Sequence, residues 1–237
     1  MRVISSRLAA AAGACFVVAV VVGSVLNSVG SNADGVDSVS VTAYQRELTT
    51  TSRIGWSLIV LGLLSLLAFL GYLHRWLRRF EAGDDWLSTA VLGAGLLFLA
   101  LSLGELVTVM AGRNPGDDLT TAVASTLLDL DEAAFAVSGL MFGVFVLLTG
   151  VHITAYRTLP RWLGLLGGLC GGLAATAGGV AVVSMGRYFP LPYVASLAWM
   201  LSLSILLTIS ARPQRGTLLS PSRTAEPGNR AGEEWSR

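Results

Sequence analysis

The stretch TLPRWLGLLGGLCGGLAATAGG, residues Thr158 to Gly179, contains seven glycines between Gly164 and Gly179. In water, each glycine inside a helix costs about 1 kcal/mol of helix stability relative to alanine. In a lipid bilayer the backbone has no water to bond, so an apolar segment stays helical despite its glycines. Pro160 suits the first turn of a helix, where its missing N–H costs nothing. The stretch therefore predicts a membrane-spanning helix with little side-chain bulk.

The small residues of this helix form two adjacent rows when they are counted in steps of four. One row holds Gly164, Gly168, Gly172 and Thr176, and the other holds Gly167, Gly171, Ala175 and Gly179. Such a bare face lets a neighbouring helix approach closely, as in small-xxx-small motifs. Gly139 and Gly143 of the preceding apolar segment are the predicted partners, because a short connection makes the two helices antiparallel neighbours. We interpret the rows as a packing surface, and a helix that slides during transport is the alternative.

The composition of the whole chain is that of an integral membrane protein. Hydrophobic residues make up 53% of its 237 residues and charged residues 13%, and the mean hydropathy is +0.67. Soluble domains carry about 25% charged residues. A bilayer span needs about 20 apolar residues, and six segments are that long: Leu8–Val29, Ile54–Leu73, Leu87–Met110, Ala133–Ala155, Leu163–Met185 and Leu191–Ser210. The predicted fold is all-α, a six-helix transmembrane bundle over residues 1–210.

The distribution of arginine predicts the orientation of this bundle. If the N-terminus is cytoplasmic, 12 of the 16 arginines lie on the cytoplasmic side and 4 on the outer side, and the excess belongs inside. Both termini are therefore expected in the cytoplasm of a multi-pass plasma-membrane (bacterial inner-membrane) protein, with residues 211–237 as a disordered tail. The first segment has an alternative interpretation as a cleaved signal peptide, which would leave five helices.

A further short helix is expected outside the membrane, between the third and fourth spans. Leu119, Val123, Leu127 and Leu130 recur at helical spacing, with hydroxyl residues between them. Asp117 and Asp118 stand where a helix cap would lie. The pattern predicts a short amphipathic helix on the outer surface that leads into the fourth span.

One acidic residue lies within a predicted span, and three open another. Glu105 is about five residues from the outer end of the third span, and Asp129, Asp131 and Glu132 begin the fourth. Charged side chains within a span suggest a functional site, whereas carboxylates at a helix start are also stabilised by the helix dipole. Two interpretations stay open: local structural roles, or an outer acidic vestibule that acts as an ion or proton site.

The fourth span and the segment after it resemble a bacterial family of six-span membrane proteins labelled domain of unknown function 4386. The resemblance rests on Phe142-Gly143 and Gly150 in the span, and on the Leu-Pro-Arg-Trp-Leu-Gly sequence from Leu159 to Gly164. In length, span count and motif order it covers about residues 10–210. It implies a six-helix bundle without an assigned activity and brings no catalytic residues.

The remaining chemistry of the chain is sparse. Cys15 and Cys170 lie in apolar runs without a metal or redox motif, and His74 and His152, near the inner ends of spans, are interpreted as interfacial side chains. Neither an enzyme activity, a metal nor a cofactor is predicted, and the net charge of +1 gives no indication of nucleic-acid binding. We expect a structural or interaction role in the bilayer, with a second copy or another membrane protein as partner. The alternatives are a small-solute or ion transporter using Glu105 and, less favoured, a membrane-embedded enzyme.

Overall fold

The computed structural model describes residues 2–30, 50–81, 86–111, 121–184 and 190–210. These residues form six helices, which are α1 (Arg2–Gly30), α3 (Thr50–Leu77), α4 (Leu87–Ala111), α5 (Thr121–Tyr156), α6 (Arg161–Ser184) and α7 (Leu191–Ser210). All six are long and apolar enough to cross a membrane. The predicted all-α bundle of six spans is confirmed. The predicted tail and the caps at Asp117 and Asp118 lie outside the described residues.

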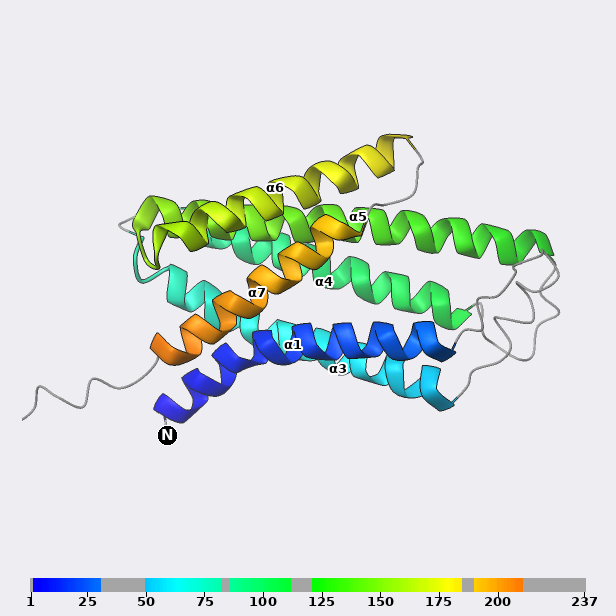
Figure 1. The fold of residues 1–237 in the computed structure, drawn as a ribbon, viewed down its shortest axis with the longest axis horizontal. Coiled ribbons are helices and arrows are strands. Elements are labelled where there is room, and N and C mark those ends of the chain that lie inside the picture. The colour runs from blue at the N-terminus through cyan, green and yellow to red at the C-terminus, as the bar shows by residue number, and fades with distance from the viewer. Residues whose placement is uncertain (1, 31–49, 82–85, 112–120, 185–189, 211–237) are drawn as a thin grey trace, which may run out of the picture.

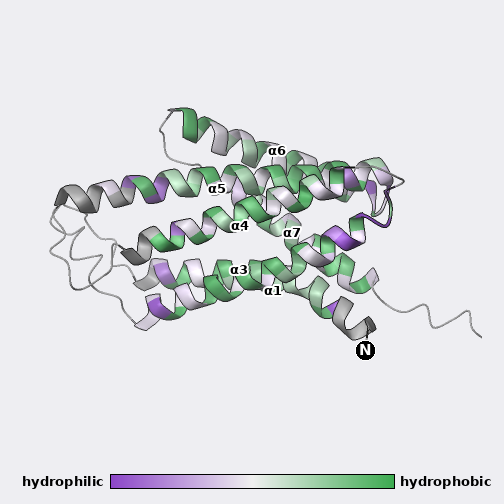
Figure 2. Ribbon diagram, turned by 180° about the vertical axis from the view of Figure 1, so that it is seen from behind, coloured by the Kyte–Doolittle hydropathy of each residue, from purple (hydrophilic) through white to green (hydrophobic). Residues whose placement is uncertain are grey.

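Hydrophobic residues run along most of each helix, and hydrophilic residues gather toward the two ends of the bundle (Figure 2). Large apolar side chains such as Leu64, Leu169 and Val183 are exposed on the outer surface. A water-soluble protein does not present so continuous an apolar surface. In a membrane, however, lipid tails cover these side chains, and each helix satisfies its own backbone hydrogen bonds.

The described helices close a ring in the order of the chain. Each helix packs against the next, and α7 returns to pack against α1 and also contacts α5. Figure 1 shows α1 and α3 as one pair and α5 and α6 as another, with α4 and α7 crossing between the pairs on opposite faces. We call the end where α1 begins and α7 finishes the terminal end, and the opposite end the distal end.

Helix α5 is longer than the sequence pattern suggested. It begins at Thr121 and continues through the fourth span without a break. The expected short amphipathic helix is therefore the first part of α5 where it is described, and not a separate element. The reason is local, because no glycine or proline interrupts residues 121–138 and nothing in that stretch ends a helix.

Helix α1 bends in its first half (Figure 1), the part that contacts Ser204 of α7. The Ser204 hydroxyl donates to the Ala10 carbonyl at 2.5 Å and accepts from the Ala14 backbone N–H at 2.9 Å. Ala10 and Ala14 are i and i+4, so the hydroxyl sits between the partners of one helical hydrogen bond. A side chain inserted in this ladder is an established cause of helix bending. Phe16 of α1 follows this contact and is fully buried in the bundle.

Candidate functional site

A cavity of about 520 Å³ lies within the distal half of the bundle. Its walls come from α1, α3, α4, α5 and α7, so only α6 among the six described helices contributes no lining residue. The wall is mostly apolar, with side chains such as Val20, Ile59 and Leu197. Polar groups are few: Ser24, Asn27, Trp56, Ser102, Glu105, Ser138 and Tyr193. A largely apolar chamber with a few converging polar groups is typical of a small-molecule site.

Glu105 is the carboxylic acid in the described lining of this cavity. It lies one turn of α4 beyond Ser102, which lines the same wall. Asp131 of α5 is near enough to interact with it electrostatically. Asp129 and Glu132, in contrast, are exposed, because neighbouring residues on a helix point in different directions. Of the four carboxylates considered as a vestibule, the structure thus brings Glu105 and Asp131 together and leaves Asp129 and Glu132 at the surface.

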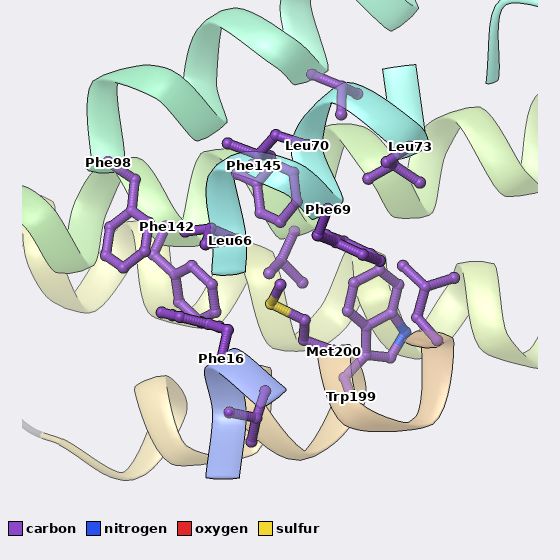
Figure 3. Close-up of a cluster of buried hydrophobic side chains, with 14 of the residues drawn as sticks. Phe16, Leu66, Phe69, Leu70, Leu73, Phe98, Phe142, Phe145, Trp199 and Met200 are labelled. Atoms are coloured by element: carbon purple, nitrogen blue, oxygen red, sulfur yellow. The ribbon is translucent and has the colours of Figure 1, made fainter. Parts of the chain in front are cut away.

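Aromatic side chains form the floor of the cavity near the middle of the bundle. The rings of Phe16 and Phe98 lie edge to face at 6.2 Å between centroids, and Phe98 lies 4.8 Å from Phe142. Phe142 also contacts Tyr193 in the cavity wall, at 5.1 Å. Figure 3 shows Phe16, Phe98 and Phe142 pointing toward one another from α1, α4 and α5. Phe16 and Phe98 line the cavity and Phe142 packs behind Phe98, so side chains of three helices close it toward the terminal end.

The bundle beneath this floor is densely packed. Phe69 and Leu70 of α3, Phe145 of α5 and Met200 of α7 all lie in this region (Figure 3) and are at most 1% exposed. These apolar side chains come from three helices and meet in the middle of the bundle. The cavity is accordingly confined to the distal half.

A buried polar cluster lies at the terminal end of the bundle. Glu81 follows α3, and its carboxylate oxygen lies 3.2 Å from Nε2 of His152 on α5. The two side chains are 3% and 0% exposed. The same carboxylate accepts hydrogen bonds at 2.6 Å from the backbone N–H and the hydroxyl of Ser88. Glu81 thus connects the start of α4 to α5.

Two more side chains complete this cluster. Nδ1 of His74 lies 3.2 Å from the Ser88 carbonyl oxygen, a hydrogen bond when that nitrogen carries the proton. The Tyr156 ring lies 4.5 Å from the His152 imidazole. His152 is fully buried, which overturns its interpretation as an interfacial side chain. His152 lies near the inner end of its span, but the Glu81 side chain packs against its imidazole.

A model of one protein family matches residues 11–210, nearly the whole helical part of the chain. The family is described as "Domain of unknown function (DUF4386)". The chain belongs to the DUF4386 family. No curated protein and no solved structure matches it. The family resemblance inferred from the fourth span and its following segment is confirmed, and the chain is a multi-pass membrane protein.

The glycines of α5 and α6 in this DUF4386 chain either contact a neighbouring helix closely or face open space. Gly143 and Gly150 of α5 lie against α6, and Gly164 and Gly171 of α6 lie against α5, so closely that an added Cβ would collide with the facing helix. Gly167 accommodates the indole of Trp199, whose Nε1 donates to the Leu163 carbonyl at 2.8 Å. At Gly168, Gly172 and Gly179 a Cβ would meet nothing within 4 Å. Gly139 is buried.

The two rows counted in fours therefore do not coincide with the contact surface of α6. Its buried positions are Leu163, Gly164, Gly167, Gly171, Ala174, Gly178 and Ala181, which from Gly164 onward advance in steps of three and four. Two helices that pack nearly antiparallel repeat their contacts every seven residues, whereas steps of four drift around the helix. Gly178, which the rows omitted, is in the interface, where its Cβ would lie 2.7 Å from the Leu140 nitrogen.

The cluster of Glu81, Ser88 and His152 is the part of the DUF4386 chain that sequence reasoning missed. Glu81 lies outside every apolar segment, so hydropathy gives no indication of a role for it. A signal was present nonetheless, because Glu81 and His152 lie near the same predicted membrane surface. A carboxylate and an imidazole at matching depth are candidate partners, but only the packing of α4 against α5 selects this pair.

Proposed function

We propose that this protein binds a small solute in the distal cavity and moves it across the membrane. The observation that carries the proposal is the cavity itself, about 520 Å³ in volume, with Glu105 in its wall. A purely structural bundle would have little reason to keep a cavity of this size beside an acidic side chain. The proposal therefore favours the transporter over the structural or interaction role, and it assigns the chain no catalysis.

The position of the cavity supports movement as well as binding. It reaches from the distal half to the aromatic floor, where Phe16, Phe98 and Phe142 come from three separate helices. Alternating access needs a barrier whose parts separate when helices tilt. A floor shared between three helices meets that need, because a relative movement of α1, α4 and α5 would part the rings. Glu105 would meet the solute on the open side of this barrier.

Access of water to the cavity tests the proposal directly. In a C15A/C170A background, Ser102→Cys places a thiol in the cavity wall, one helical turn from Glu105. Ser196→Cys is the matched control, because Ser196 is fully buried and does not line the cavity. The purified variants, in nanodiscs, are treated with a membrane-impermeant cationic methanethiosulfonate, and mass spectrometry follows modification over time.

We expect S102C to be modified at least about tenfold faster than S196C, because thiolate chemistry requires access from water. Elution as a single symmetric peak in size-exclusion chromatography checks that each variant is folded. Equal, slow modification of both thiols would show that the cavity is closed to solutes, and the proposed function would then be abandoned in favour of the structural role.

A further inference from the structure

We propose that the solute is an organic cation: an ammonium group beside Glu105 with an apolar, preferably aromatic, body against the floor of the cavity. This inference rests on the proposed function and names the substrate class of that same site. It follows from three properties of the described lining: its charge, its size and its aromatic side chains.

The charge of the lining selects cations over anions. Glu105 lies in the wall and Asp131 adds its negative field from α5. Among the described lining residues there is no arginine and no histidine to neutralise an anion. Within an apolar wall, a charge interacts more strongly with its partner than in water. An anionic solute would thus be repelled, and a cationic one attracted, by the same two carboxylates.

The size and apolarity of the chamber select an organic solute over a metal ion or a sugar. A volume of about 520 Å³ falls within the range of ligand pockets, roughly 300 to 1,000 Å³, and greatly exceeds that of a dehydrated metal ion. A sugar would place most of its hydroxyls against side chains such as Val20, Ile59 and Leu63. Each hydroxyl left without a hydrogen bond costs free energy, so an apolar body fits this wall better.

The aromatic side chains give a second site of attraction for a cation. Phe16, Trp56, Phe98 and Tyr193 all line the cavity. An ammonium group near an aromatic face gains about 0.5–1 kcal/mol, and more where water is excluded. The floor also offers an aromatic ring of the solute the edge-to-face contacts that Phe16 and Phe98 already make with each other.

Three probes that share one apolar body isolate the role of the charge. They are 4-phenylbutylamine, a cation at neutral pH, 4-phenylbutyrate, an anion, and 4-phenyl-1-butanol, which is neutral. Each is added to the S102C variant in nanodiscs, and its protection of the thiol is measured as the ratio of modification rates with and without the probe. Because the ratio is taken within each variant, any effect of Glu105 on the reagent itself cancels.

We expect the amine to slow modification about fivefold more than the alcohol does, the equivalent of about 1 kcal/mol, and the butyrate to protect least. Glu105→Gln in the S102C background should remove the preference for the amine. Glu132→Gln is the matched control, because Glu132 is an exposed carboxylate at the same end of the bundle, and it should keep the preference.

The outcomes distinguish failure of the organic-cation inference from failure of the proposed function. Equal protection by the amine and the alcohol would identify an apolar site, such as one for a lipid acyl chain, and would overturn the organic-cation inference. A reactive thiol that none of the probes protects would overturn it too, and both of these results leave the proposed function standing. An S102C thiol as unreactive as S196C would overturn both.

Discussion

The pair formed by Glu81 and His152 shows how much one residue outside the spans does for the bundle. Its carboxylate is buried, contacts the imidazole at 3.2 Å and accepts two hydrogen bonds from Ser88. A buried ion or strong hydrogen-bond acceptor is stable only when its partners are in place. Removal of either side chain alone should therefore lower the free energy of unfolding by more than replacement of both side chains together.

A double-mutant cycle tests this dependence. His152→Phe should lower the unfolding free energy by about 3 kcal/mol, because the Glu81 carboxylate stays buried without its imidazole. Glu81→Gln should cost a similar amount, and the double variant should cost clearly less than the sum of the two. Thermal unfolding in detergent, followed by size-exclusion chromatography, measures all four proteins. Strict additivity would show that the two side chains do not interact.

At the scale of elements, the bundle is built from two closely packed helix pairs. Gly23 and Gly55 meet between α1 and α3, where a Cβ on Gly23 would lie 2.6 Å from the Gly55 carbonyl. Gly150 and Gly164 meet in the same way between α5 and α6. Lipid tails are as apolar as the side chains, so close backbone contact, and not exclusion of water, holds such pairs together.

The adjacent glycines Gly171 and Gly172 separate the two roles that glycine has in α6. Gly171→Ala should destabilise the protein by about 2 kcal/mol, because the new Cβ would collide with the Leu147 backbone. Gly172→Ala should be neutral or stabilise by up to about 1 kcal/mol, because its Cβ meets nothing within 4 Å. Thermal unfolding of the two variants measures the difference. A loss of stability of the same size for both would contradict the seven-residue contact pattern.

At the scale of the whole molecule, the ring of helices places the candidate site. Because α1, α3, α4, α5 and α7 all line the cavity, a solute in it would contact five helices. The order of the helices in the ring also tests whether the two halves of the chain form an inverted repeat. Viewed along the membrane normal, α1, α3 and α4 follow one another around the ring in the same rotational direction as α5, α6 and α7. A two-fold axis in the membrane plane would relate two halves that run in opposite rotational directions. An inverted repeat therefore does not relate these two halves.

The arginine distribution gives the whole molecule a testable orientation, with the distal cavity facing the outside. In right-side-out membrane vesicles, an impermeant methanethiosulfonate should modify S102C and spare F80C, whose parent side chain is exposed at the terminal end. Inside-out vesicles should reverse this pattern, because the cytoplasmic side carries the excess arginine. Labelling of F80C alone in right-side-out vesicles would place the start of α1 and the end of α7 outside.

The sequence by itself determined the six spans and the family. Apolar length and the need of a backbone in lipid to bond itself are local properties, so Gly164 to Gly179 could be assigned to a helix without any knowledge of its neighbours. The prediction that α5 and α6 are neighbours followed from their short connection in the same way. Glu105 was also visible, as a charge within an apolar segment.

Only the tertiary structure decided what these elements form together. The crossing of α5 and α6 determined that Gly171 and Gly178 are in contact while Gly172 is not. The closure of the ring brought Glu81 to His152 and formed the cavity beside Glu105. The physical reason is that each of these features depends on contacts between residues far apart in the chain, and neither hydropathy nor periodicity within one segment specifies how two helices cross.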